Sequence, residues 1–395
     1  MISNQALRSL HIRPIVFLLA TFFMFEVNAA SQEPIMIGIT AEFGMQNSQA
    51  AQSIEKGVLL AIDEINESGG VLGRKFALEK RDDRGLPARA VDNLIEMSEN
   101  KNVVALFCGR FSPVALDLVP EANRIGLPLL DPWAAADSIT ASPSPNYVYR
   151  LSLTDSWAIG ALLGHAQSRG MKKLAVILPN TAWGRSVDSA INAQQPSGMA
   201  LIREWYNWGD TEFLPMLAHV RMEGAQGIIL VANETEGSLF VKQMVVLPEN
   251  QRLPIISHWG IAGGDFVAMT GDALAAVDLV VVQTFGFNGR RGKKEKQVAA
   301  RFTARFGGSV DNLQGQVGFA HAYDLTHLLA MAIKKSGSTG RAEIRTALEQ
   351  IKSYDGLVRH YAQPFSANDH EALDRSQLYF ARFGYKHNLI PVQSK

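Results

Sequence analysis

The 395-residue chain contains 38 basic and 38 acidic residues, so its formal net charge at pH 7 is zero. A balanced charge gives no broad basic surface, and we therefore expect no nucleic-acid partner. A content of 47% hydrophobic and 19% charged residues is typical of a globular protein, and the length suits two domains. The single cysteine, Cys108, cannot form a disulfide within the chain and is expected in the core, because it ends an apolar run.

The first 30 residues have the pattern of an export signal. Residues 1–13 contain arginine but no acidic residue, and an apolar stretch follows at residues 14–25. Ala29, and Val27 two positions before it, then fit a signal-peptidase site. A membrane anchor is the alternative, but a spanning helix needs roughly 20 apolar residues, which this stretch does not reach. We expect a signal peptide at residues 1–29, cleaved near Ala29, and a mature chain in the periplasm.

Strands and helices are predicted to alternate through the first part of the mature chain. Short apolar or β-branched runs predict buried strands. These runs occur at residues 35–40, 76–80, 103–108 and 125–130. Between the runs, apolar residues recur at three- and four-residue steps, which is typical of amphipathic helices. The first such helix spans residues 48–68 and is expected to end at the glycines 69–70.

The alternation begins again after residue 153. Strands are predicted at residues 174–178, 201–205, 227–231, 254–257 and 277–282. Two helices follow at residues 320–335 and 341–352, and a last strand pair at residues 378–383 and 389–392. Strands and helices in this order form parallel sheets with right-handed crossovers. The predicted fold class is therefore α/β, with two doubly wound parallel-sheet lobes.

The sequence lacks the short motifs that mark common catalytic and cofactor sites. It has no G-x-G-x-x-G after a strand, no G-x-x-x-x-G-K-[ST] phosphate loop and no G-x-S-x-G nucleophile elbow. The nine histidines are scattered, and the spacing of His321 and His327 matches no zinc motif. We therefore predict no catalytic residue, no metal, no cofactor and no enzyme activity.

Several segments carry a resemblance to a known family. They are residues 57–73 (GVLLAIDEINESGGVLG), 81–90 (RDDRGLPARA), 109–113 (GRFSP), 126–128 (GLP), 132–135 (PWAA), 183–184 (WG) and 322–324 (AYD). In order and spacing they resemble the leucine/isoleucine/valine-binding proteins, which are type I periplasmic binding proteins of ABC importers. The similarity covers nearly the whole mature chain.

The resemblance implies two lobes joined by three hinge crossovers, with the ligand bound in the cleft between the lobes. The crossovers are expected near residues 150–153, 283–285 and 357–359. Lobe 1 is expected to comprise residues 30–150 plus 284–356, and lobe 2 residues 151–283 plus 357–395. Open α/β sheets bind ligands at the carboxyl ends of their strands, which places the cleft there. Hinge closure is then expected to bury the ligand.

By this resemblance, ligand-binding residues lie in the loops that follow the strands. They are Phe43, Arg110, Phe111, Ser112, Trp133, Ala134, Ala135, Trp183, Asn233, Glu234 and Trp259. In the family a serine at the position of Ser112 binds the ligand carboxylate. A helix N-cap before Pro113 is the structural alternative for Ser112, and both roles can hold at once. Glu234 is the acid expected to face a ligand cation, and Arg110 is able to face an anion.

Departures from the family pattern suggest a changed ligand. Ala135 stands where the family has a threonine, Trp183 where it has a tyrosine, and the acid that binds the ligand ammonium is replaced near Trp259. Trp133 and these two tryptophans either pack in the core or offer flat aromatic faces to one cleft. An ammonium without an acidic partner is costly to bury. We expect an aromatic or other small organic acid or amide rather than a standard amino acid.

The predicted function is that of a solute receptor for an ABC importer, with a small-molecule ligand and an inner-membrane ABC permease as partners. The same architecture serves receptors that report to a chemoreceptor or a sensor kinase. A periplasmic enzyme that uses the same cleft is the alternative of a different class. The basic run at residues 289–294 is either a solvated loop or a docking contact for a partner.

Overall fold

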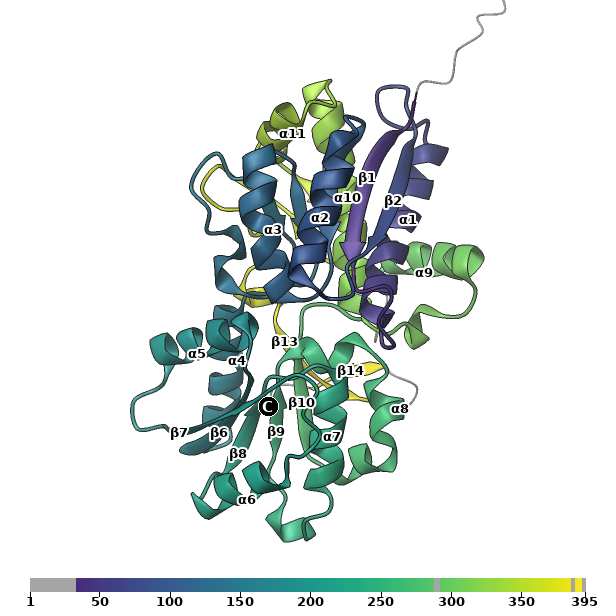
Figure 1. Cartoon of the computed structure of the whole chain (residues 1–395). Coiled ribbons are helices and arrows are strands. Elements are labelled where there is room, and N and C mark those ends of the chain that lie inside the picture. Colours follow the sequence, from purple (N-terminus) through teal and green to yellow (C-terminus); the bar gives the residue numbers. More distant parts are fainter. Residues whose placement is uncertain (1–32, 288–291, 385–387, 393–395) are drawn as a thin grey trace, which may run out of the picture. The chain divides into compact units, whose positions relative to one another are not determined.

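The computed structural model describes residues 33–287, 292–384 and 388–392 (Figure 1). The predicted signal peptide, with its cleavage near Ala29, lies outside the described residues, as do the arginines of the basic run. Within the described part of the chain, no helix combines the length and the apolar character needed to cross a membrane.

The first sheet has five parallel strands in the order β2-β1-β3-β4-β5. Its strands are β1 (Ile35–Ala41), β2 (Phe76–Asp82), β3 (Val103–Cys108), β4 (Leu129–Asp131) and β5 (Val148–Arg150). All six residues of β3 are buried, as its continuous apolar run predicts for a strand covered on both faces. The strand expected at residues 125–130 begins only at Leu129. Ile125 still belongs to a helix, which ends at Gly126 with φ 74°.

Helices cover both faces of this sheet (Figure 1). Helices α1 (Gln49–Glu67), α10 (Gln316–Ser336) and α11 (Arg341–Leu348) share one core with it, whereas α2 (Pro87–Glu99) and α3 (Ser112–Ile125) build a second core. Helix α9 (Lys293–Phe306) contacts α1. Helices α1 and α10 approach closely because Gly57 has no side chain. A Cβ at this position would lie 2.2 Å from the carbonyl oxygen of Phe319.

The second sheet has seven strands in the order β14-β13-β10-β9-β8-β6-β7. Its strands are β6 (Lys173–Pro179), β7 (Ala200–Tyr206), β8 (Gly227–Leu230), β9 (Ile255–Ser257), β10 (Leu279–Gln283), β13 (Tyr379–Phe383) and β14 (Leu389–Pro391). Its helices are α4 (Asp155–Ser168), α5 (Ala182–Gln194), α6 (Leu214–Met222), α7 (Glu234–Met244) and α8 (Phe266–Thr270). Strands β6 to β10 are parallel, and the last strand pair is antiparallel. The predicted α/β class with two parallel-sheet lobes is confirmed.

Three connections join the two sheets, and the third lies further along the chain than expected. The first leads from β5 to α4, and the second from β10 to α9. After the short pair β11 (Tyr354–Asp355) and β12 (His360–Tyr361), the chain stays with the first sheet. Its N–H groups at Leu357 and Val358 donate to the buried Asp324 of α10, at 2.6 and 2.9 Å.

Residues 370–372 then lie beside β5. The N–H of Arg150 donates to the carbonyl of His370, and the N–H of Ala372 donates to the carbonyl of Arg150, both at 2.9 Å. The third connection therefore follows Ala372, and its expected position at residues 357–359 is wrong. Sequence spacing does not reveal hydrogen bonds to Asp324 or to Arg150.

Candidate functional site

A pocket lies at the carboxyl ends of the strands, where open α/β sheets bind ligands. Its cavity volume is about 10 Å³, roughly the space that one water molecule needs. It is lined by Arg110, Phe111, Ser112, Trp133, Ala135, Trp183, Trp208, Asn233, Trp259 and Gly260. The first five follow β3 and β4 of the first sheet, and the others follow β6, β7, β8 and β9 of the second. Eight of the eleven residues expected to bind ligand therefore come together.

Three helices begin at this pocket. Helix α3 starts at Ser112, α5 starts one residue before Trp183, and Asn233 is the N-cap of α7. The first N–H groups of a helix have no partner within the helix, and the helix dipole favours negative charge at this end. The backbone around the pocket therefore favours an anionic or hydrogen-bond-accepting ligand.

Ser112 joins two of the pocket loops. It is the first residue of α3, and Phe111 is the N-cap, so the alternative role of Ser112 as the N-cap is wrong. Its hydroxyl oxygen accepts hydrogen bonds from the N–H groups of Ala135 and Ala136, at 3.2 and 3.3 Å. Because that oxygen is the acceptor in both bonds, the hydroxyl proton remains available to a ligand.

The tryptophans expected from the sequence are buried and line the pocket. The rings of Trp133 and Trp259 lie 5.6 Å apart at 47°, although they come from different sheets. The indole N–H of Trp183 donates to Asp155 at 3.1 Å, which fixes the orientation of this ring. His258 lies 3.2 Å from the same carboxylate, and neither His258 nor Asp155 lines the pocket. Trp183 therefore presents carbon atoms, rather than its N–H, to a ligand.

Trp208 and Gly260 are pocket residues that sequence reasoning missed. Trp208 lies just beyond the carboxyl end of β7, which is the positional signal that identified the other tryptophans. Its ring is 5.2 Å from that of Phe111, and its buried N–H finds no hydrogen-bond partner among the described residues. At Gly260, a Cβ would lie 2.5 Å from the carbonyl oxygen of Ala232 and 2.7 Å from the Trp183 ring. Only a glycine lets this loop approach Trp183 so closely.

Arg110 and Glu234 bind each other. The guanidinium donates two hydrogen bonds to the carboxylate, at 2.6 and 2.8 Å, and both side chains are buried. The Arg110 Nε lies 3.2 Å from a carboxylate oxygen of Glu42. Burial raises the pKa of Glu42 to about 7, against the opposing effect of Arg110. Glu234 does not line the pocket, and its carboxylate binds Arg110; the expected contact with a ligand cation stays a prediction.

Two further expected residues lie outside the pocket. Ala134 packs in the core between the first sheet and helices α2 and α3, and its N–H donates to Asp131 at 2.7 Å. The Phe43 ring lies beneath the ammonium of Lys80, 4.8 Å away. Both residues follow the carboxyl ends of strands, but the turn after each strand directs the side chain elsewhere.

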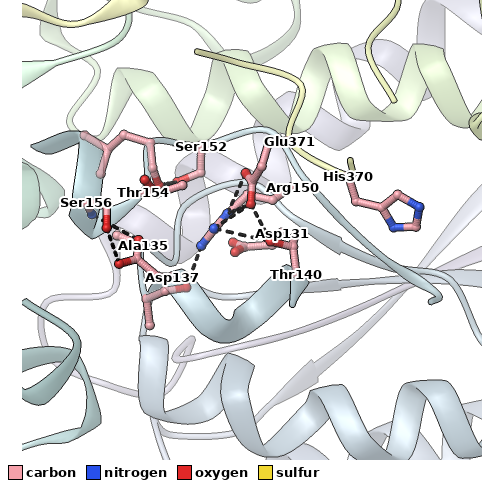
Figure 2. Close-up of polar contacts among 12 residues, drawn as sticks. Asp131, Ala135, Asp137, Thr140, Arg150, Ser152, Thr154, Ser156, His370 and Glu371 are labelled. Atoms are coloured by element: carbon pink, nitrogen blue, oxygen red, sulfur yellow. Dashed lines mark hydrogen bonds and ion pairs between the residues drawn. The ribbon is translucent and has the colours of Figure 1, made fainter. Parts of the chain in front are cut away.

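The loop that carries Trp133 and Ala135 is held by Arg150 at the end of β5 (Figure 2). The Arg150 guanidinium donates to the carbonyls of Ala134 and Ala136, at 3.3 and 2.7 Å. It also forms a bidentate pair with Glu371, at 2.9 and 2.6 Å. Arg150 is fully buried, so this network fixes the pocket loop to the end of β5 and to the segment that precedes the third connection.

Residues of the first connection and of the start of α4 bond directly to the same loop (Figure 2). The hydroxyl of Ser152 donates to the carbonyl of Trp133 at 2.9 Å, and the hydroxyl of Ser156 donates to Asp137 at 2.6 Å. The N–H of Asp155 donates to the carbonyl of Ala135 at 2.8 Å. These bonds tie the pocket loop to the first connection and to the start of α4.

Among the described residues, no group of three His, Cys, Asp or Glu side chains is arranged to hold a metal ion. The pocket offers hydrogen-bond donors and aromatic faces, and no described acidic side chain lines it. Such a site can bind a small molecule. The two lobes and the pocket at their strand ends define the class of two-lobed solute-binding proteins.

Comparison with known proteins identifies the family. Residues 34–386 match the family described as "Periplasmic binding protein". The Leu/Ile/Val-binding protein BraC3 of Rhizobium johnstonii is 25% identical over 325 residues, which cover 80% of this chain and 84% of that protein. The chain belongs to the type I periplasmic binding proteins, in the leucine/isoleucine/valine-binding family. This family consists of solute-binding proteins and not of enzymes.

Two solved structures share the fold. The substrate-binding protein LivJ of Streptococcus pneumoniae, in complex with isoleucine, has a TM-score of 0.76 at 21% identity and covers 91% of this chain and 99% of its own. An ABC-transporter solute-binding protein of R. palustris, in complex with benzoate, has a TM-score of 0.75 at 19% identity, with coverage of 91% and 95%. At these identities the likeness concerns the fold.

Proposed function

We propose that the protein is the periplasmic receptor of an ABC importer and binds a small aromatic acid, or a related organic acid or amide, in this pocket. One observation carries the proposal. Five aromatic side chains and three helix N-termini surround the pocket, and no described acidic side chain lines it. Aromatic faces favour a flat ring, and the helix ends favour a carboxylate or an amide oxygen.

An α-amino acid suits this pocket less well. Its ammonium needs an acidic partner, because an unpaired charge is costly to bury. Glu234 is bound to Arg110, and Asp155 accepts from Trp183 without lining the pocket. Isoleucine and benzoate are both ligands of structural neighbours. The chemistry of this pocket favours a ligand of the benzoate type.

The ligand proposal is tested with purified mature protein. A thermal-shift screen compares benzoate, 4-hydroxybenzoate and benzamide with leucine and isoleucine, because a ligand of the folded state raises its stability. Calorimetry then measures the dissociation constants. We expect the aromatic compounds to bind and the two amino acids to bind weakly. Tight binding of leucine with no binding of the aromatic acids would refute the ligand proposal.

A matched pair of variants tests the site. Trp183→Ala removes a pocket ring and should weaken binding by more than about tenfold, or about 1.4 kcal/mol. Trp157→Ala removes a half-buried ring on α4 that does not line this pocket, and should leave affinity unchanged. Equal losses of affinity in the two variants would mean that the ligand binds outside this pocket.

Export and hinge closure belong to the same proposal. We propose cleavage near Ala29, and a boundary between the lobes at the connections after β5, after β10 and after Ala372. Small-angle scattering should show a smaller radius of gyration when ligand is added, because closure brings the lobes together. N-terminal sequencing of the protein recovered from the periplasm tests the cleavage site.

A further inference from the structure

Three buried charges lie next to the pocket. Arg110 follows β3 of the first sheet, and Glu234 begins α7 after β8 of the second, so their bidentate bond joins the two lobes. Glu42 follows β1 and lies 3.2 Å from the Nε of Arg110. The side chains are 3%, 1% and 1% exposed for Arg110, Glu234 and Glu42 respectively, so water screens them very little.

Three glycines make room for these charges. A Cβ at Gly263 would lie 2.2 Å from Nη1 of Arg110, and a Cβ at Gly264 would lie 2.7 Å from the Glu234 carboxyl carbon. At Gly109 a Cβ would lie 2.5 Å from a Glu42 oxygen. A side chain at any of these positions would displace a charged group. The backbone of both lobes is therefore shaped around the ion pair.

Arg110 and Glu234 occupy each other's charged groups, so neither is free to bind a ligand group of opposite charge. Both oxygens of Glu234 accept from Arg110, at 2.6 and 2.8 Å. Burying such charges is costly, and a bidentate geometry offsets the cost. A ligand ammonium would have to compete with Arg110 for this carboxylate. Arg110 itself lines the pocket, so a ligand cation would also meet a positive neighbour.

We propose that Arg110 and Glu234 are specificity-determining residues that, by binding each other beside the pocket, exclude ligands that carry an ammonium group. This inference rests on the proposed function, because it assumes that the aromatic pocket binds the ligand. An amino-acid ligand could make charged contacts to both lobes. In this chain the Arg110–Glu234 pair makes the charged contact between the lobes instead. The ligand then needs only a ring and a hydrogen-bond acceptor.

The test uses three probes with one aromatic ring: benzoate, benzamide and benzylamine. Calorimetry at pH 8 measures their binding to the wild-type protein and to two single variants. Arg110→Met leaves the Glu234 carboxylate unpaired beside the pocket, which should improve benzylamine binding relative to benzoate by about tenfold or more. Glu234→Gln removes the negative charge that neutralises Arg110, which should shift the ratio of benzylamine binding to benzoate binding towards benzoate. The double variant Arg110→Met/Glu234→Gln should return to a selectivity near that of the wild type.

The opposite signs of the two shifts separate this role from a structural one. If both single variants weaken the three probes equally, the pair only holds the fold, and the proposal is wrong. If Arg110→Met mainly abolishes benzoate binding with no gain for benzylamine, Arg110 is an anion-binding residue instead. Should Arg110→Met not fold, Arg110→Met/Glu42→Gln removes one stranded carboxylate and retains Glu234 for the same measurement. Failure of the wild type to bind any aromatic acid or amide would refute the proposed function instead.

Discussion

The positions of the pocket rings depend on residues that have no side chain. The ring of Trp133 lies against α10, where a Cβ at Gly318 would be 2.5 Å from its Cε3 atom. Gly260 has the same role for Trp183, at 2.7 Å. Protein interiors are packed densely, so a single methyl group at such a contact moves the ring or the helix. The aromatic pocket is therefore specified as much by its glycines as by its tryptophans.

Gly318→Ala should displace Trp133 and weaken ligand binding by about tenfold, with a loss of about 1–3 kcal/mol in the free energy of unfolding. Calorimetry and chemical denaturation measure the two effects. Gly164→Ala on α4 is the matched control, because a Cβ there meets no atom within 4 Å. Alanine is the better helix former, so this control should stabilise the protein slightly. Unchanged affinity in Gly318→Ala would mean that Trp133 does not contact the ligand.

Trp208 provides a hydrogen-bond donor without a partner among the described residues. Trp208→Phe keeps an aromatic ring next to Phe111 but removes the indole N–H. We expect benzoate to bind about fivefold to tenfold more weakly, since one hydrogen bond to the ligand is lost. Trp157→Phe is the control outside the pocket. If the two variants bind benzoate equally well, the N–H of Trp208 does not serve the ligand.

At the scale of the elements, the sequence was most informative where burial is continuous. The run at residues 103–108 coincides with β3, and the last strand pair lies within one residue of its predicted position at all four of its ends. The third connection was misplaced because its path depends on Asp324 and Arg150, which contact segments far along the chain. No local periodicity encodes such contacts.

Part of the site could also be predicted from the sequence. Residues directly after strand ends could be placed by the family resemblance, and Trp133, Trp183 and Trp259 do line one pocket. The pairing of Arg110 with Glu234, 124 positions apart, could not be read from the sequence, which instead assigned both to the ligand. Side-chain partners between separate segments are the information that a single sequence lacks.

Glu371→Ala tests how the pocket loop is held. The variant leaves the fully buried Arg150 without its bidentate partner, so we expect the free energy of unfolding to fall by about 3–5 kcal/mol. Chemical denaturation measures the loss. Glu121→Gln removes the partner of the exposed Arg124 and should have little effect. Equal stability of the two variants would show that the Arg150 pair contributes no more than a surface ion pair.

Across the whole molecule, buried ionisable groups make stability depend on pH. Burial raises the pKa values of Glu42 and Asp131 to about 7 and that of Asp83 to about 6. Burial lowers the pKa of His321 to about 4. As the pH rises, the folded chain therefore keeps protons on these acids at pH values where the unfolded chain has released them. As the pH falls, the folded chain leaves His321 unprotonated at pH values where the unfolded chain protonates it. The two effects act in opposite directions.

Asp131→Asn isolates the first effect. The folded wild type binds an extra proton between its raised pKa and the ordinary value of 3.8, so this group destabilises it as the pH rises through 7. Asparagine keeps the oxygen that accepts from the N–H groups of Trp133 and Ala134. From pH 8 to pH 6 the wild type should gain about 1.4 kcal/mol in unfolding free energy relative to the variant. Denaturant titrations measure the free energy of unfolding of both proteins. If it depends on pH in the same way in the wild type and in Asp131→Asn, this expectation is wrong.

His321 contributes to the acid side of the profile, and its ring links three segments. Its Nε2 atom lies 3.0 Å from the hydroxyl of Thr284, in the second connection. Its Nδ1 atom lies 2.8 Å from the carbonyl oxygen of Pro132, in the loop of Trp133. Since its folded pKa lies below the ordinary 6.5, its contribution to stability is lost as the pH falls from about 6.5 to 4. His321→Gln cannot take up this proton.

Between pH 6.5 and pH 5, the free energy of unfolding should therefore fall by about 1.5 kcal/mol less in the variant than in the wild type, even if the variant is less stable at both pH values. Because the folded chain keeps His321 unprotonated down to about pH 4, its contacts with Thr284 and Pro132 persist, and the ligand affinity of the wild type should stay constant over the same range. Calorimetry at pH 6.5 and pH 5 checks this expectation. A decline in affinity between these two pH values would mean that the folded protein protonates His321 above pH 5.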